Sequence, residues 1–140
     1  MSTFTIGDTE FGVDLEESER SIDTTQPNVI ELMLEVYGDQ ERFDAITDDD
    51  ESEWSWALYP PHFYLRGLTV PSSTVNDFVE LPKPDDNDEI EAAIYIMEHN
   101  PVYDLRILIV PHSHVETLGM VEVMGRPQRF HLKSEMNLVA

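Results

Sequence analysis

The fold prediction depends most on residues 29–38, which read VIELMLEVYG. Apolar side chains recur in this stretch at the spacing of one helix face, at Val29, Leu32, Met33, Val36 and Tyr37. Thr25 or Asn28 can cap the start of such a helix, and Gly38 can supply the positive φ that ends it. The sequence therefore predicts a helix here.

Shorter elements are predicted on both sides of this helix. Thr3–Leu15 places apolar residues on alternate positions around Gly7 and Asp8, which is typical of a hairpin. Residues 16–26 contain few apolar side chains and are expected to form a surface loop. A short helix over residues 39–46 would pack Phe43 and Ile46.

From residue 54 onward the apolar period changes from 3.6 to 2, which favours strands. We expect strands over residues 54–59, 62–70, 90–96 and 105–110, a turn at 99–101, a connector at 81–88, and a last hairpin over 118–124 and 128–133. The predicted fold class is α+β: a mostly antiparallel sheet of about six strands with one or two helices on one face. Residues 1–140 are expected to form a single acidic domain of this kind.

The charge of the chain is large and unevenly distributed. Its 140 residues include 8 Lys and Arg against 29 Asp and Glu, a formal net charge of −21. Residues 1–60 hold 17 acidic and 2 basic side chains, whereas residues 99–140 hold four of each. Such a field repels nucleic acid phosphates and anionic membranes and attracts a basic protein, so a basic protein is the predicted partner.

Other sequence features bear on chemistry and compartment. The chain has no cysteine, and its first residues lack the positive charge and apolar run of a signal peptide. We therefore expect a cytoplasmic protein. No Gly-rich phosphate loop, nucleophile elbow or dinucleotide fingerprint is present in the sequence, so we predict no cofactor and a non-catalytic role.

An acidic run leads directly into two tryptophans. The candidate partner-binding residues are Asp48, Asp49, Asp50, Glu51, Glu53, Trp54 and Trp56. Carboxylates accept bidentate bonds from Arg, and Trp is enriched in binding hot spots. The alternative is that the tryptophans belong to the core beside a solvated loop, and we expect this for at least one of them because large aromatic side chains are mostly buried.

Histidines near residue 112 suggest a metal site as an alternative. His112, His114 and Glu116 alternate, so an extended chain would project all three side chains to the same side. The competing interpretation is an exposed turn after Pro111 that contains two histidines. We predict no metal in the favoured function.

Three of the eight Lys and Arg residues gather near the end of the chain together with one histidine, at Arg126, Arg129, His131 and Lys133. On a strand, the last three would form an outward stripe. We expect this stripe to protect a sheet edge by charge. The alternative is a contact with the acidic half of another copy, which would give a homodimer.

Together these features predict a non-catalytic, acidic cytoplasmic inhibitor or immunity protein that neutralises a basic toxin or nuclease domain. The alternatives are a metal-dependent enzyme or metal-binding domain built on the His-x-His-x-Glu cluster, an acidic secretion chaperone, and a DNA mimic. Acidity as an adaptation to salt is a further explanation of the charge.

Overall fold

A computed structural model of the chain describes residues 2–49, 51–81, 91–96, 98–111 and 113–135. These residues form one α-helix, α1 (Gln40–Thr47), one short 3-10 helix (Ser72–Thr74), and ten strands. The strands are β1 (Thr3–Ile6), β2 (Thr9–Glu10), β3 (Asp14–Asp23), β4 (Val29–Tyr37), β5 (His62–Pro71), β6 (Phe78–Glu80), β7 (Glu91–Ile96), β8 (Glu98–Val110), β9 (His114–Val123) and β10 (Arg126–Glu135).

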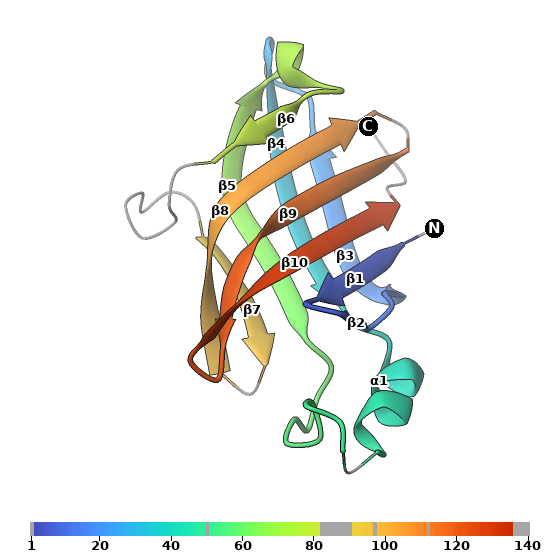
Figure 1. Ribbon diagram of the computed structural model, residues 1–140. Coiled ribbons are helices and arrows are strands. Elements are labelled where there is room, and N and C mark those ends of the chain that lie inside the picture. Colours follow the sequence, from blue (N-terminus) through green and yellow to red (C-terminus); the bar gives the residue numbers. More distant parts are fainter. Residues whose placement is uncertain (1, 50, 82–90, 97, 112, 136–140) are drawn as a thin grey trace.

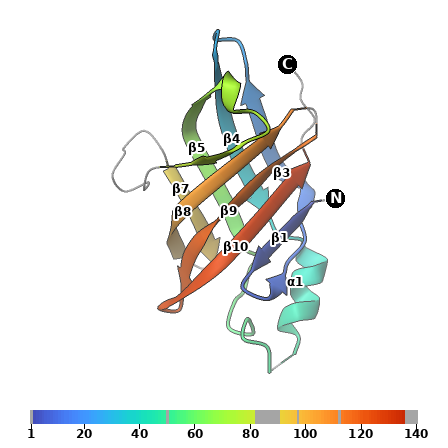
Figure 2. The same cartoon turned by 45° about the horizontal axis from the view of Figure 1, so that its top comes forward.

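Nine of these strands form one sheet in the order β2-β1-β10-β9-β8-β7-β5-β4-β3, and β6 pairs with β8 off this path. Every pairing is antiparallel. The sheet curls into a half-barrel, with β8 to β10 on one side of the core and β3 to β5 on the other (Figures 1 and 2). The α+β prediction, with about six strands and helices on one face, is wrong because the protein is mostly β.

The predicted helix over residues 29–37 is strand β4. The fully or nearly fully buried residues of this stretch are at alternate positions: Ile30, Leu32, Leu34 and Val36. The stretch contains one apolar set at helical spacing and a different, overlapping set at alternate positions, so the local pattern is ambiguous. Strands β3 and β5 hydrogen-bond to β4 from both sides, and these nonlocal partners favour the extended form.

Three other element predictions are wrong. Residues 14–23, most of which were expected in a loop, form β3, whose many carboxylates suit a strand at the end of the sheet order. Residues 54–59 form turns instead of a strand, with the backbone N–H of Ala57 donating to the carbonyl of Trp54. Residues 99–101 lie within β8, and the expected turn is therefore not there.

Several predictions are confirmed. The predicted hairpin forms in part: β1 pairs with β2 (Thr9–Glu10), whereas the second strand expected over residues 11–15 is not formed, since residues 11–13 belong to no strand and β3 begins at Asp14. Strands β5 and β7 and the β9–β10 hairpin lie where the period-two pattern places them. The expected connector lies outside the described residues except for Leu81.

Strand β8 belongs to both halves of the curled sheet. Its first residues pair with β7, and its residues from Val102 onward pair with β9. A bulge between Tyr103 and Arg106 lies just after this change of partner, within the pairing with β9, and Asp104 within it adopts a φ of 53°. Because a bulge bends a strand and increases its twist, β8 turns the sheet toward itself at this point.

The core fills the inside of the curl. Phe63 of β5 and Phe130 of β10 meet across it, with ring centroids 5.7 Å apart. Gly119 of β9 leaves room for this packing, because a methyl group there would lie 2.9 Å from Phe130 Cε1 and 3.0 Å from Leu105 Cδ2. The absence of a side chain at Gly119 thus allows Phe130 and Leu105 to pack over β9 at this position.

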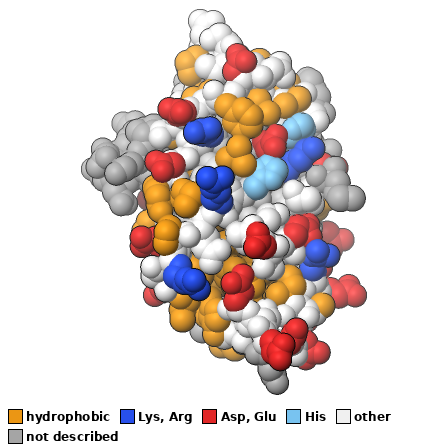
Figure 3. Space-filling view, in the orientation of Figure 1, with side chains coloured by type: hydrophobic (Ala, Val, Ile, Leu, Met, Phe, Trp, Pro, Cys, Tyr) orange, Lys and Arg blue, Asp and Glu red, His pale blue; other side chains and the backbone are white. Residues whose placement is uncertain are grey.

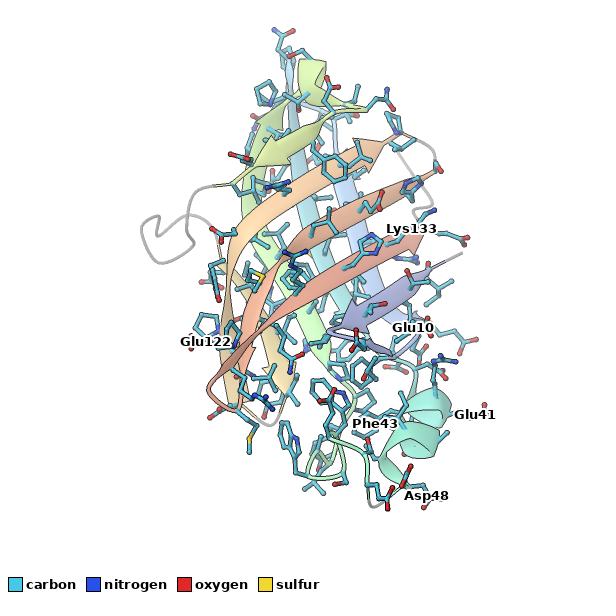
Figure 4. The ribbon with its side chains drawn as sticks, viewed as in Figure 1. Glu10, Glu41, Phe43, Asp48, Glu122 and Lys133 are labelled. Atoms are coloured by element: carbon cyan, nitrogen blue, oxygen red, sulfur yellow. The ribbon has the colours of Figure 1, made fainter. Side chains whose placement is uncertain are left out.

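Helix α1 covers one end of the half-barrel rather than a sheet face (Figure 1). The Asp39 side chain caps it by accepting from the backbone N–H of Arg42 at 2.9 Å. Phe43 is 2% exposed and packs against Phe11, while Glu41 projects from the opposite side of the helix (Figure 4). The predicted short helix is therefore present. The prediction that it would lie on one face of the sheet is wrong, because α1 covers an end of the half-barrel.

Truncating a core side chain tests the burial of β8. We expect Ile107→Ala to lower the free energy of unfolding by about 2–5 kcal/mol, because it removes buried methyl groups and leaves a cavity. Ile107 is 1% exposed. Urea denaturation measures the change. Leu108→Ala on the outer face is the matched control and should cost clearly less, so equal losses would contradict the assigned orientation.

Adding a methyl group at Gly119 tests the close packing around Phe130. We expect Gly119→Ala to destabilise the protein by about 1–3 kcal/mol through overpacking. The double variant Gly119→Ala with Phe130→Leu should lose less than the sum of the two single variants, because the smaller side chain makes room. Additive losses in thermal or urea denaturation would count against this contact.

Candidate functional site

The acidic segment, defined as residues 48–53, begins where α1 ends. Asp48 is the C-cap residue, and Figure 4 shows it at the tip of the molecule. Asp49, Glu51 and Glu53 are exposed, and Asp49 Oδ1 accepts from the backbone N–H of Glu51 at 3.0 Å. Asp50 lies outside the described residues. The carboxylates described here therefore face solvent from a series of turns.

The two tryptophans have different environments. Trp54 is 2% exposed, its Nε1–H donates to Thr9 Oγ1 at 2.9 Å, and its ring meets Phe11 edge-on. Trp56 is partly buried against the core. The expectation that at least one tryptophan belongs to the core is confirmed, and Trp54 is not available to a partner. Leu58 and Tyr59 are instead exposed beside the acidic segment, at 65% and 63%.

Sequence reasoning missed a hollow on the outer face of β4, β5 and β7. We call it the tyrosine hollow; its volume is about 550 Å³, and its lining includes Tyr37, Tyr59, His62 and Tyr95 with the carboxylates of Asp14 and Glu17. The rings of Tyr37 and His62 stack face to face, with centroids 4.0 Å apart and an interplanar angle of 13°, so each ring covers one face of the other. Aromatic faces and carboxylates thus line the same space.

The carboxylate of Glu35 contacts both Tyr37 and His62. Its Oε1 accepts from the Tyr37 hydroxyl at 3.5 Å and lies 3.3 Å from His62 Nε2. Burial and the neighbouring carboxylates of Glu35, Glu17 and Glu19 raise the pKa of Tyr37 above its usual value, so this phenol stays protonated and neutral near pH 7. Burial is the larger cause of the raised pKa of Tyr37, and the nearby carboxylates that add to it also attract cations.

A second hollow adjoins the first and shares His62 and Tyr95 with it. Arg66 lines this second hollow, and its guanidinium lies 5.3 Å from the centre of the Tyr64 ring. Arg66 Nη2 also lies 3.5 Å from Glu35 Oε1. This surface therefore already holds one guanidinium between an aromatic face and a carboxylate.

The signal for these hollows was present in the sequence. His62, Tyr64 and Arg66 alternate along a predicted strand and were expected to share a face. Tyr37 was assigned to a helix and Tyr59 to a strand, so neither could be placed beside them. Only the pairing of β4 with β5, which sets Tyr37 opposite His62, brings the aromatic residues together.

The histidine cluster differs from the one predicted. His112 lies outside the described residues. His114 and Glu116 project from β9, and His131 of β10 joins them: its Nε2 lies 2.7 Å from Glu116 Oε1, and His114 Nε2 lies 3.9 Å from Glu116 Oε2. Both imidazoles therefore face the same carboxylate. Among the described residues, no group of three or more His, Cys, Asp or Glu is arranged to hold a metal ion.

The basic residues near the C-terminus lie on the outer face of β8 to β10, where Figure 3 shows Lys, Arg and His side chains. Arg129, His131 and Lys133 alternate along β10, Arg126 begins that strand, and Arg106 of β8 lies nearby, lining a hollow together with Arg129. The prediction that these charges protect a sheet edge is wrong, because β10 is paired with β1 and β9 on its two sides.

Comparisons with protein-family models, with curated proteins and with solved structures find no match to this chain. In the part of the chain that the structure describes, no helix has both the length and the apolar character needed to cross a membrane.

Metal titration tests the cluster of His114, Glu116 and His131. We expect zinc or manganese at about 0.1 mM to leave the melting temperature unchanged, because no group of three or more described ligand residues is arranged to hold a metal ion. A tight site would instead raise the melting temperature, since the metal would stabilise the folded state by mass action. Differential scanning fluorimetry of the full chain measures this. A rise in melting temperature that His114→Ala or His112→Ala abolishes would favour the metal site instead.

Proposed function

We propose that this protein is a non-catalytic binding protein that captures a basic protein partner. The observation that carries the proposal is the position of the acidic segment beside exposed Leu58 and Tyr59 at the end of the molecule that α1 covers. Carboxylates there can pair with Lys and Arg, while the exposed apolar side chains supply area that a partner can bury. Binding energy and charge complementarity thus come from one surface.

The class of partner follows from the charge. A protein of net charge −21 steers a cationic protein toward it and raises the association rate. Many nucleases and toxin domains present a cationic substrate cleft, and covering that cleft would inhibit them. We therefore propose that the protein is an inhibitor or immunity protein and that it acts in the cytoplasm.

Neutralising the acidic segment tests this function. A variant with Asp48→Asn, Asp49→Asn, Glu51→Gln and Glu53→Gln should bind a basic nuclease at least about tenfold more slowly at low salt, because its steering field is weaker. Association of the full chain with a panel of basic nucleases, followed by biolayer interferometry, measures the rate. Raising salt from about 50 to 500 mM should slow the wild type and narrow this difference.

The matched control neutralises carboxylates at the other end of the sheet. Asp23→Asn, Glu31→Gln, Asp77→Asn and Glu80→Gln remove exposed charges from β3, β4 and the region of β6. This control should slow association much less than the acidic-segment variant. Equal effects of the two variants, or a salt-independent association rate, would contradict a localised capture surface.

A further inference from the structure

The tyrosine hollow has a composition suited to one kind of side chain. Its walls are the stacked rings of Tyr37 and His62, the exposed ring of Tyr59, and Tyr95. Carboxylates of Asp14 and Glu17 stand at its rim. Among the described residues, neither Lys nor Arg lines this hollow. It therefore offers aromatic faces and negative charge with no cation from the chain's own described residues.

The rim carboxylates are held in place by local structure. Strand β3 is irregular between Asp14 and Glu19. The buried hydroxyl of Ser18 donates to the carbonyl of Asp14 at 2.6 Å and accepts from the backbone N–H of Tyr37 at 3.0 Å. Asp14 Oδ1 in turn accepts from the backbone N–H groups of Glu16 and Glu17. These hydrogen bonds through Ser18 therefore connect the backbone at Asp14 with the backbone at Tyr37.

Like charges face each other beneath the hollow. Glu19 of β3 is paired directly with Glu35 of β4. Opposed carboxylates on neighbouring strands destabilise a sheet, and a cation placed near them relieves that repulsion. Repulsion between these two carboxylates thus favours binding of a cation here, and this effect does not depend on the acidic segment.

We propose that the tyrosine hollow is the pocket for an arginine side chain of the basic partner; this rests on the proposed function and names its anchor. Arg66 next to it shows the chemistry, because its guanidinium lies over Tyr64 and near Glu35. A planar guanidinium stacks on flat rings and pairs with carboxylates in a fixed geometry, which a lysine ammonium does not match. Arginine is therefore the occupant that fits both the walls and the rim.

The test uses oligoarginine and oligolysine peptides of equal length as probes of the full chain. We expect wild-type protein to bind oligoarginine more tightly, and Tyr59→Ala to weaken that binding about fivefold. Tyr59→Phe should retain the affinity because it keeps the aromatic face. Glu17→Gln should weaken binding through lost charge. Phe78→Ala, which removes an exposed aromatic ring of β6 that does not line the hollow, is the matched control and should bind like wild type.

A direct readout locates the bound peptide. In NMR titrations, the backbone amides of Tyr37, His62 and Tyr95 should shift on adding oligoarginine to the wild type and shift less in Tyr59→Ala. Unchanged affinity in both Tyr59→Ala and Glu17→Gln, while the neutralised acidic segment still weakens binding, would overturn the pocket and leave the proposed function standing. No binding of any basic peptide or nuclease to wild-type protein would overturn both.

Discussion

The bend of β8 is the constraint on which the rest of the structure depends. One continuous strand pairs with β7 through residues 98–101 and with β9 from Val102 onward, so the two halves of the sheet cannot separate without breaking β8 ladders. Because the sheet turns there, Phe63 and Phe130 meet across a shared interior instead of lying on distant parts of a flat sheet. The bulge is therefore what allows an almost all-β chain to enclose a core.

Curling also distributes the charges of the molecule unevenly. The outer face of β8 to β10 carries Arg106, Arg129 and Lys133 together with Glu116 and Glu122, whereas the outer face of β3 to β5 carries Glu17, Glu19, Glu31 and Glu35 with Arg66. A flat sheet would place these side chains on a single surface and allow more mutual screening. On the curled sheet they face away from each other, so the negative side keeps a strong local field. This is the side that holds the tyrosine hollow.

The proposed capture surface combines two kinds of structure. The acidic segment is a series of turns whose carboxylates face solvent, which suits long-range attraction and a fast first encounter. The tyrosine hollow is built on strands, and its wall is a stacked pair of rings supported by Glu35. Groups on paired strands hold their geometry better than groups on turns, which suits specific short-range contact. The acidic segment thus supplies long-range attraction and the tyrosine hollow supplies short-range recognition, and both lie at the same end of the molecule.

Local sequence was sufficient for features that depend on near neighbours. Net charge and its uneven distribution, helix α1 and the β9–β10 hairpin could all be predicted, because each is decided by composition or by residues a few positions apart. Residues 29–37 could not, because their apolar residues fit two periods and only hydrogen bonding to β3 and β5 selects the strand. The same holds for the site: Trp54 is buried by Phe11 and Thr9, and Tyr37 meets His62 only through pairing of distant strands. Sequence by itself determined which charges and aromatic side chains the protein carries, and tertiary structure decided which of them meet, because the strand pairings that join them span long separations along the chain.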